Sequence, residues 1–90
     1  MEGITYSIEP WYSWFIIRLD DPVFSRPWYL KSIGPKFGYN WTSDSTYARG
    51  FSLRTAQKYL DMLQAGADTD WERYHNSWKE YYEYLHSKEG

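Results

Sequence analysis

The hydrophobic periodicity of this 90-residue chain changes once, at Ser52, and that change limits the fold more than any other feature. Before Ser52, apolar and polar residues alternate in short runs that Pro and Gly interrupt, which is typical of β-strands. After Ser52, apolar residues recur every three or four positions, which is typical of amphipathic helices. Because strands come first and helices last, the order predicts a single α+β domain of two layers. We expect an antiparallel sheet of three to four strands, followed by two C-terminal helices.

The strand-like segments have clear bounds in the sequence. We expect strands at about residues 4–8, 12–19, 28–33 and 37–42, and a further strand over residues 46–51 is left open. Pro10 is expected to end or turn the first strand, because proline cannot donate a hydrogen bond to a ladder. In the last of the four, Phe37, Tyr39 and Trp41 would share one face of the sheet.

The second predicted strand is apolar on both faces. Phe15, Ile17 and Leu19 would lie on one face, and Trp14, Ile16 and Arg18 on the other. Such a strand is either covered on both sides or leaves one face for a partner.

Capping residues and apolar spacing define the two helices, which we expect at about residues 53–65 and 70–86. Ser52 is a suitable N-cap for the first helix, and Gly66 is a suitable residue to follow its end. Thr69 and Glu72 have the spacing of a capping box at the start of the second helix. An apolar stripe then follows the second helix, and we expect its central residue, Trp78, to be buried against the sheet or the first helix. The stripe consists of Trp71, Tyr74, Trp78, Tyr81, Tyr82 and Leu85.

Residues 41–60 carry a local pattern of a Trp-bearing strand, then Ala-x-x-Phe-Ser, then Ala-x-x-Tyr on a helix. The matching residues are Trp41, Ala48, Phe51, Ser52, Ala56 and Tyr59. This pattern resembles small phage and prophage proteins, although Arg54 and Thr55 stand where that pattern usually has an acidic residue. The resemblance implies a strand-turn-helix unit and an origin in a mobile element. It also implies a function in which a short phage protein binds and inhibits a host protein, such as a defence enzyme. It supplies no functional residues.

The composition argues against catalysis. The chain has no Cys, which excludes thiolate metal sites and thiol nucleophiles. His75 and His86 lie eleven residues apart, about 16 Å along a helix, so they cannot share a metal ion. We therefore expect His75 to be a residue of the helix surface or its boundary. Asp20 and Asp21 are expected to serve as turn residues. No phosphate-binding or nucleophile motif is present, and we predict no enzyme activity, no cofactor and no metal.

The charge distribution leaves a second function open. Residues 26–58 contain six Lys or Arg residues and one acidic residue, whereas both ends of the chain are acidic. Basic residues interleaved with aromatic rings on a sheet are typical of proteins that bind single-stranded nucleic acid. For that alternative the candidate residues are Tyr39, Trp41, Arg49, Arg54 and Lys58. A basic middle segment that simply faces the acidic second helix would explain the same distribution.

The aromatic content favours a protein-binding module. Aromatic residues make up 22% of the chain, with six Trp, ten Tyr and four Phe. Trp, Tyr and Arg dominate the binding energy of protein interfaces, and we expect some of these rings to be exposed. We predict a non-catalytic module that binds a protein of the host, with candidate contacts Trp14, Arg26, Trp28 and Lys31. A homodimer through the face of Trp14 and Ile16 is a third alternative. Since no signal peptide or membrane-spanning run is visible, the expected location is the cytoplasm.

Overall fold

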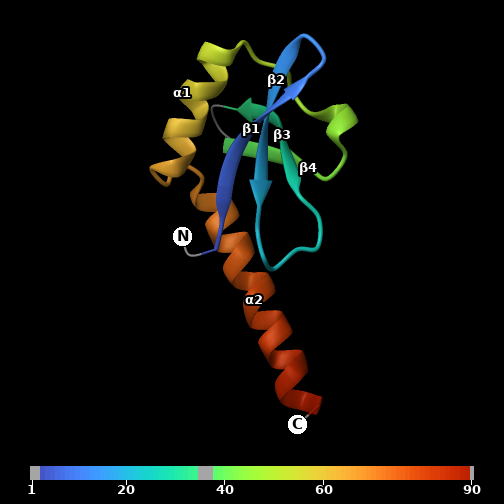
Figure 1. The fold of residues 1–90 in the computed structure, drawn as a ribbon. Coiled ribbons are helices and arrows are strands. Elements are labelled where there is room, and N and C mark those ends of the chain that lie inside the picture. Colours follow the sequence, from blue (N-terminus) through green and yellow to red (C-terminus); the bar gives the residue numbers. More distant parts are fainter. Residues whose placement is uncertain (1–2, 35–37, 90) are drawn as a thin grey trace.

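Four antiparallel strands form one sheet in a computed structural model that describes residues 3–34 and 38–89. The strands lie in the order β1-β2-β3-β4, and a 3-10 helix and two α-helices follow them (Figure 1). Their bounds are β1 Thr5–Trp11, β2 Trp14–Asp20, β3 Trp28–Gly34, β4 Gly38–Thr42, η1 Ser45–Tyr47, α1 Leu53–Gln64 and α2 Thr69–Glu89. This architecture confirms the predicted α+β class, with a four-stranded meander before two C-terminal helices.

Helix α1 covers one face of the sheet, and the hydrophobic core lies between them. Ile17 and Leu30 come from the sheet, Ala56 and Leu63 from α1, and Phe51 from the segment before α1. Half-buried side chains of the same sheet face surround this centre, and Tyr59 joins them from α1. The pairing of Ile8 with Ile17 and of Leu30 with Trp41 places these side chains on one face, as the period-two pattern predicts. Phe37, which was expected on this face, lies outside the described residues.

The opposite face of β2 is less open than its sequence indicates. Ile16 has no exposed surface, and the Arg18 guanidinium lies 2.7 Å from Glu9 Oε1 and 2.9 Å from Asp20 Oδ1. Figure 1 shows η1 on the side of the sheet opposite to α1. We considered the face of Trp14 and Ile16 for a homodimer. Because Ile16 is buried, only Trp14 of these two residues is exposed to a partner.

The further strand that was left open over residues 46–51 does not form. Residues 45–47 form η1, where the Asp44 carboxylate accepts a hydrogen bond from the Thr46 N–H. Phe51 forms an isolated bridge with β2, exchanging two backbone hydrogen bonds of 2.8 and 2.9 Å with Phe15. The Arg49 N–H donates a further backbone hydrogen bond of 2.9 Å to the Leu30 carbonyl of β3. Strand β3 pairs with β2 at two registered positions, Arg18 with Tyr29 and Leu19 with Trp28. Phe51 therefore occupies the edge of β2 beyond the point where β3 leaves it.

Pro10 does not end β1, contrary to expectation. The strand continues to Trp11, and Pro10 pairs with Phe15 of β2. The physical reason is the place of β1 at the edge of the sheet, where one side of the strand needs no N–H donor.

Helix α2 begins differently from the predicted capping box. The N-cap is Asp68, whose Oδ1 accepts a hydrogen bond of 3.0 Å from the Trp71 N–H, and Thr69 is the first helical residue. Aspartate is among the strongest N-caps because its carboxylate also complements the helix dipole. The expected break before it is confirmed, since Gly66 has a φ of 89° after the end of α1.

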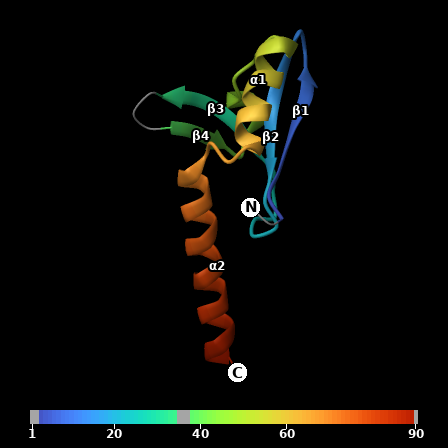
Figure 2. The same ribbon diagram turned by 90° about the vertical axis from the view of Figure 1, so that its left-hand side faces the viewer.

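Only the first turns of α2 pack on the sheet. Figure 2 shows α2 running away from the sheet and ending far from it, and the molecule measures 50 × 24 × 21 Å. Trp71 is 6% exposed, whereas Tyr81 is 51% exposed. Trp78, which we expected to be buried against the sheet or α1, is half-buried and contacts Phe24 of the loop between β2 and β3. Within the described residues, no helix is sufficiently long and apolar to span a membrane.

Candidate functional site

The turn between β1 and β2 is the most unusual local feature of the structure. Tyr12 and Ser13 form a two-residue turn between the paired residues Trp11 and Trp14. Tyr12 has a φ of 55°, in the left-handed region that a bulky side chain rarely enters. Glycine is the usual residue where the first position of such a turn has a positive φ. We call residues Trp11, Tyr12, Ser13 and Trp14 the hairpin tip.

The rings of the hairpin tip face solvent. Tyr12 is 90% exposed and Trp14 is 57% exposed. The ring of Trp11 meets that of Tyr12 edge to face, with centroids 5.1 Å apart. The tip therefore presents a group of aromatic rings at the end of a two-stranded projection.

The base of the hairpin tip is held firmly. A Cβ atom added at Gly50 would lie 2.9 Å from the Cβ of Trp14, so only glycine lets the chain pass this close beneath the indole. The next residues along the two segments, Phe15 and Phe51, exchange two backbone hydrogen bonds. Trp14 is thus supported by the backbone that leads into α1.

A second group of exposed rings lies on α2. Tyr74, Tyr81 and Tyr82 are 41%, 51% and 40% exposed. Trp78 connects them, with ring centroids 6.1 Å from Tyr74, 5.8 Å from Tyr81 and 5.7 Å from Tyr82. We call these four residues, together with Leu85, the aromatic ridge.

Two buried carboxylates attach the start of α2 to the sheet. Asp21 is 3% exposed, and its Oδ2 accepts a hydrogen bond of 3.0 Å from the Trp71 indole N–H. His75 Nδ1 lies 2.7 Å from the same carboxylate. The Asp68 carboxylate accepts a hydrogen bond of 2.7 Å from the Trp41 indole N–H. Both links join residues that lie far apart in the sequence.

The expectation that His75 lies at the helix surface or its boundary is therefore wrong. His75 is 6% exposed and paired with Asp21, 54 residues earlier in the chain. Its place one turn after Trp71 was the available signal, because residues four apart share a helix face. Asp21 does serve as the expected turn residue, since its Oδ1 accepts a hydrogen bond of 3.0 Å from the Val23 N–H. The pairing with His75 was not visible in the sequence.

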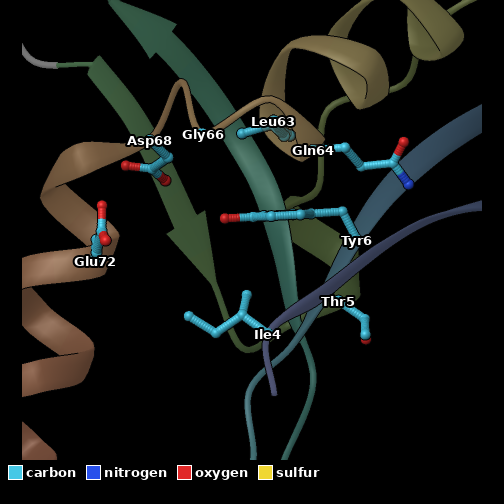
Figure 3. A pocket seen from close by; sticks show the side chains of 8 residues that line it. All are labelled: Ile4, Thr5, Tyr6, Leu63, Gln64, Gly66, Asp68 and Glu72. Carbon is cyan, nitrogen blue, oxygen red and sulfur yellow. The ribbon is translucent and has the colours of Figure 1, made fainter. Parts of the chain in front are cut away.

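A pocket of about 310 Å³ opens where β1, the end of α1 and the start of α2 meet. Figure 3 shows the Tyr6 hydroxyl pointing toward the side where Asp68 and Glu72 lie. Burial, followed by the charge of Asp68, raises the pKa of Tyr6 to about 12. Burial also raises the pKa of the Asp68 carboxyl, while hydrogen bonds from Trp71 and Trp41 act in the opposite direction. The pocket can accept hydrogen bonds or a positive charge, and its phenol stays protonated at neutral pH.

The predicted protein contacts lie in separate places. Trp14 belongs to the hairpin tip, whereas Trp28 pairs with Leu19 near the other end of β2, roughly 17 Å along the strand. Trp28 packs on Phe24 and Trp71, with ring centroids 5.6 and 5.4 Å away. Arg26 is exposed in the loop between β2 and β3, and Lys31 is exposed where the register of β3 shifts. Of this set, Trp14 alone lies within a group of exposed rings.

The predicted nucleic-acid contacts are also divided among elements. Tyr39 and Trp41 are half-buried on the face that packs against the helices, which leaves little of their rings free for stacking on bases. Arg49 is exposed, with its guanidinium 5.3 Å from the centre of the Phe51 ring. Arg54 and Lys58 are exposed on α1. In the described part of the chain, no group of three or more His, Cys, Asp or Glu residues is arranged to hold a metal ion.

Comparisons with known proteins found no match to this chain among the family models, the curated proteins or the solved structures.

Proposed function

We propose that the protein is a small, non-catalytic protein-binding module and that the hairpin tip is its contact with the partner. The observation that carries this proposal is the conformation of Tyr12, a residue with a φ of 55° and a ring that is 90% exposed. A bulky residue in the left-handed region costs roughly 1–2 kcal/mol relative to an ordinary conformation. Because the Tyr12 ring is exposed, its contacts within the chain offset little of this conformational cost. The strained residue therefore favours a role outside the fold.

The partner suited to the hairpin tip is a protein with a concave apolar surface. Tyr and Trp rings act as anchors because each buries a large area and loses few rotamers on binding. The hydrogen bonds at the base of the tip support a preorganised contact, which lowers the entropic cost of association. A module of this kind acts by occluding the surface that it covers. Inhibition of a host protein, which the phage resemblance implies, is the form of this function that we propose.

A variant that relieves the backbone conformation tests the proposal most directly. Tyr12→Gly removes the ring and places the residue best suited to a positive φ at the turn. We expect its free energy of unfolding to be unchanged or higher by up to about 1 kcal/mol. Its affinity for the partner should fall at least tenfold, a loss typical of a removed anchor (about 1.4 kcal/mol). Tyr47→Ala, at a ring that is 65% exposed on η1, is the matched control and should bind normally.

The partner for that measurement can be obtained by photo-crosslinking in a lysate of the native cells. A benzoylphenylalanine at position 12 should give one discrete protein adduct, and the same group at Gln57, exposed on α1, should not give it. The captured protein is then purified for titration against both variants. Equal binding by Tyr12→Gly and the wild type, or the same adduct from both positions, would refute the proposal.

A further inference from the structure

Trp71 and the aromatic ridge that follows it have the spacing of a coiled-coil seam. Trp71, Tyr74, Trp78, Tyr81 and Leu85 follow one another at intervals of three, four, three and four residues, which is the heptad pattern of a helix that packs along its length. The charged side chains between them fall on other positions of the helix, at Glu72, Arg73, Lys79, Glu80 and Glu83. The ridge is therefore an uncharged face.

The protein's own fold covers only the beginning of that seam. Trp71 is buried, and Tyr74 and Trp78 contact Phe24, with centroids 5.5 and 6.0 Å away. Tyr81 and Tyr82 contact Trp78 and each other. Figures 1 and 2 both show the C-terminal half of α2 extending past the sheet. The same helix face thus continues from an intramolecular interface onto an exposed surface.

We infer that a second copy of this chain covers the aromatic ridge, with the two α2 helices packed antiparallel. A two-fold contact requires a surface that is complementary to itself. An uncharged row of rings meets that requirement, because no like charges face each other across the axis. Aromatic rings also pair favourably with one another in tilted and edge-to-face arrangements.

The position of the sheet favours the antiparallel orientation. The sheet packs on the N-terminal end of α2, where Trp28 contacts Trp71, and the rest of the helix runs away from it (Figure 2). A parallel partner helix would bring the second sheet to the same place, whereas an antiparallel partner puts the two sheets at opposite ends. In the antiparallel register that continues the seam, Trp78 of one copy faces Tyr81 of the other, and Tyr74 faces Leu85.

The area available indicates a reversible dimer. Tyr74, Tyr81 and Tyr82 of the ridge, and Tyr84 beside it on α2, are between 40% and 55% exposed. With Trp78 and Leu85, such rings offer roughly 450 Å² of surface per copy. A pair would bury about 900 Å², which is below the area of stable specific interfaces and in the range of weak, transient ones. We therefore expect a dissociation constant in the range of about 10–100 μM.

Sedimentation velocity of the full chain, from about 1 μM to 1 mM, tests the inference. The wild type should change from monomer to dimer within this range. Tyr81→Glu should raise the dissociation constant at least tenfold, since it places two carboxylates near the axis. Tyr47→Glu, at a ring that is 65% exposed on η1, should leave the dissociation constant unchanged. A monomer at 1 mM, or equal effects of the two variants, overturns the inference.

The absence of cysteine allows the orientation to be measured with one introduced label. A spin label at Ser87→Cys should lie about 22 Å from its copy along an antiparallel pair in the stated register. In a parallel pair the two labels would be roughly 10–15 Å apart, near the distance between the helix axes, and that result overturns the antiparallel arrangement. The proposed function rests on a different surface. A monomeric chain whose binding still depends on Tyr12 would remove this inference and leave that function in place.

Discussion

The two halves of α2 have the same sequence pattern and very different surroundings. In the first half, Trp71 and His75 are 6% exposed and both contact the Asp21 carboxylate. In the second half, Tyr81 and Tyr82 are 51% and 40% exposed and pack on Trp78. The apolar stripe continues through both, so it is the extent of the sheet that decides which residues are buried. A hydrophobic stripe identifies the face of a helix that packs, but it does not identify the molecule on which it packs.

The largest effect should come from Trp71, which belongs to the buried half. Trp71→Ala removes a buried indole and its hydrogen bond to Asp21, and should lower the free energy of unfolding by about 3–5 kcal/mol. Tyr81→Ala, in the exposed half, should lower it by less than about 1 kcal/mol. Denaturant unfolding of the two variants measures the difference between the halves. Equal losses would mean that the second half of α2 is also held by the fold.

The polar link at His75 should have the next largest effect. His75→Ala leaves the buried Asp21 carboxylate without its imidazole partner and should cost about 2–3 kcal/mol. His86→Ala, at an exposed position near the end of α2, should be neutral. Thermal unfolding of the two variants provides the comparison. Because His75 supports the fold, partner binding by His75→Ala has to be measured under conditions in which this variant is folded. Under those conditions we predict that its affinity for the partner changes by no more than a few fold.

Trp78 lies at the boundary between the two halves and should have an intermediate effect. Its contacts with Phe24 and Tyr74 are retained in the monomer, so Trp78→Ala should cost about 1–3 kcal/mol. The loss should increase with protein concentration if the ridge also forms the dimer. Unfolding at 5 μM and at 500 μM would reveal this dependence, and a loss that is independent of concentration would assign Trp78 to the buried half alone.

The smallest effect should be a dependence of stability on pH, at the pocket beside the buried half. The pKa of Tyr6 is about 12 in the folded protein and near 10 for an ordinary tyrosine. Between these values the unfolded chain loses this proton first, so the Tyr6 contribution to stability should fall as the pH rises from about 10 to 12. Tyr6→Phe should flatten the pH dependence of the unfolding free energy between about pH 10 and 12. An unchanged dependence in Tyr6→Phe would show that the phenol is not desolvated.

The fold was readable from the sequence because its signals are local. Alternation identified β1, and capping and spacing identified α1, including its N-cap Ser52 and the turn at Gly66. The errors arose where the deciding partner lies far along the chain. Pro10 is tolerated because its strand is at an edge, and Asp68 displaced the expected cap Thr69 while also meeting Trp41.

The candidate surfaces were only partly readable. The number of aromatic residues led us to expect that some rings, Trp14 among them, are exposed, and Trp14 is 57% exposed. The positive φ of Tyr12 had no sequence signal, because the turn lacks the glycine or asparagine that usually marks it. The exposure of the aromatic ridge depends on where the sheet ends, which hydrophobic periodicity does not encode.

The arrangement of tryptophans around Trp71 also has an optical consequence. The indoles of Trp28 and Trp41 lie 5.4 and 6.0 Å from that of Trp71, at interplanar angles of 64° and 62°. Transitions of chromophores held this close at fixed angles couple, so the folded protein should give a strong near-ultraviolet circular dichroism signal. Light absorbed by nearby tyrosines should also be transferred to these indoles before emission. Because the three indoles come from β3, β4 and α2, the signal reports whether α2 is docked on the sheet, and it does so without any added dye.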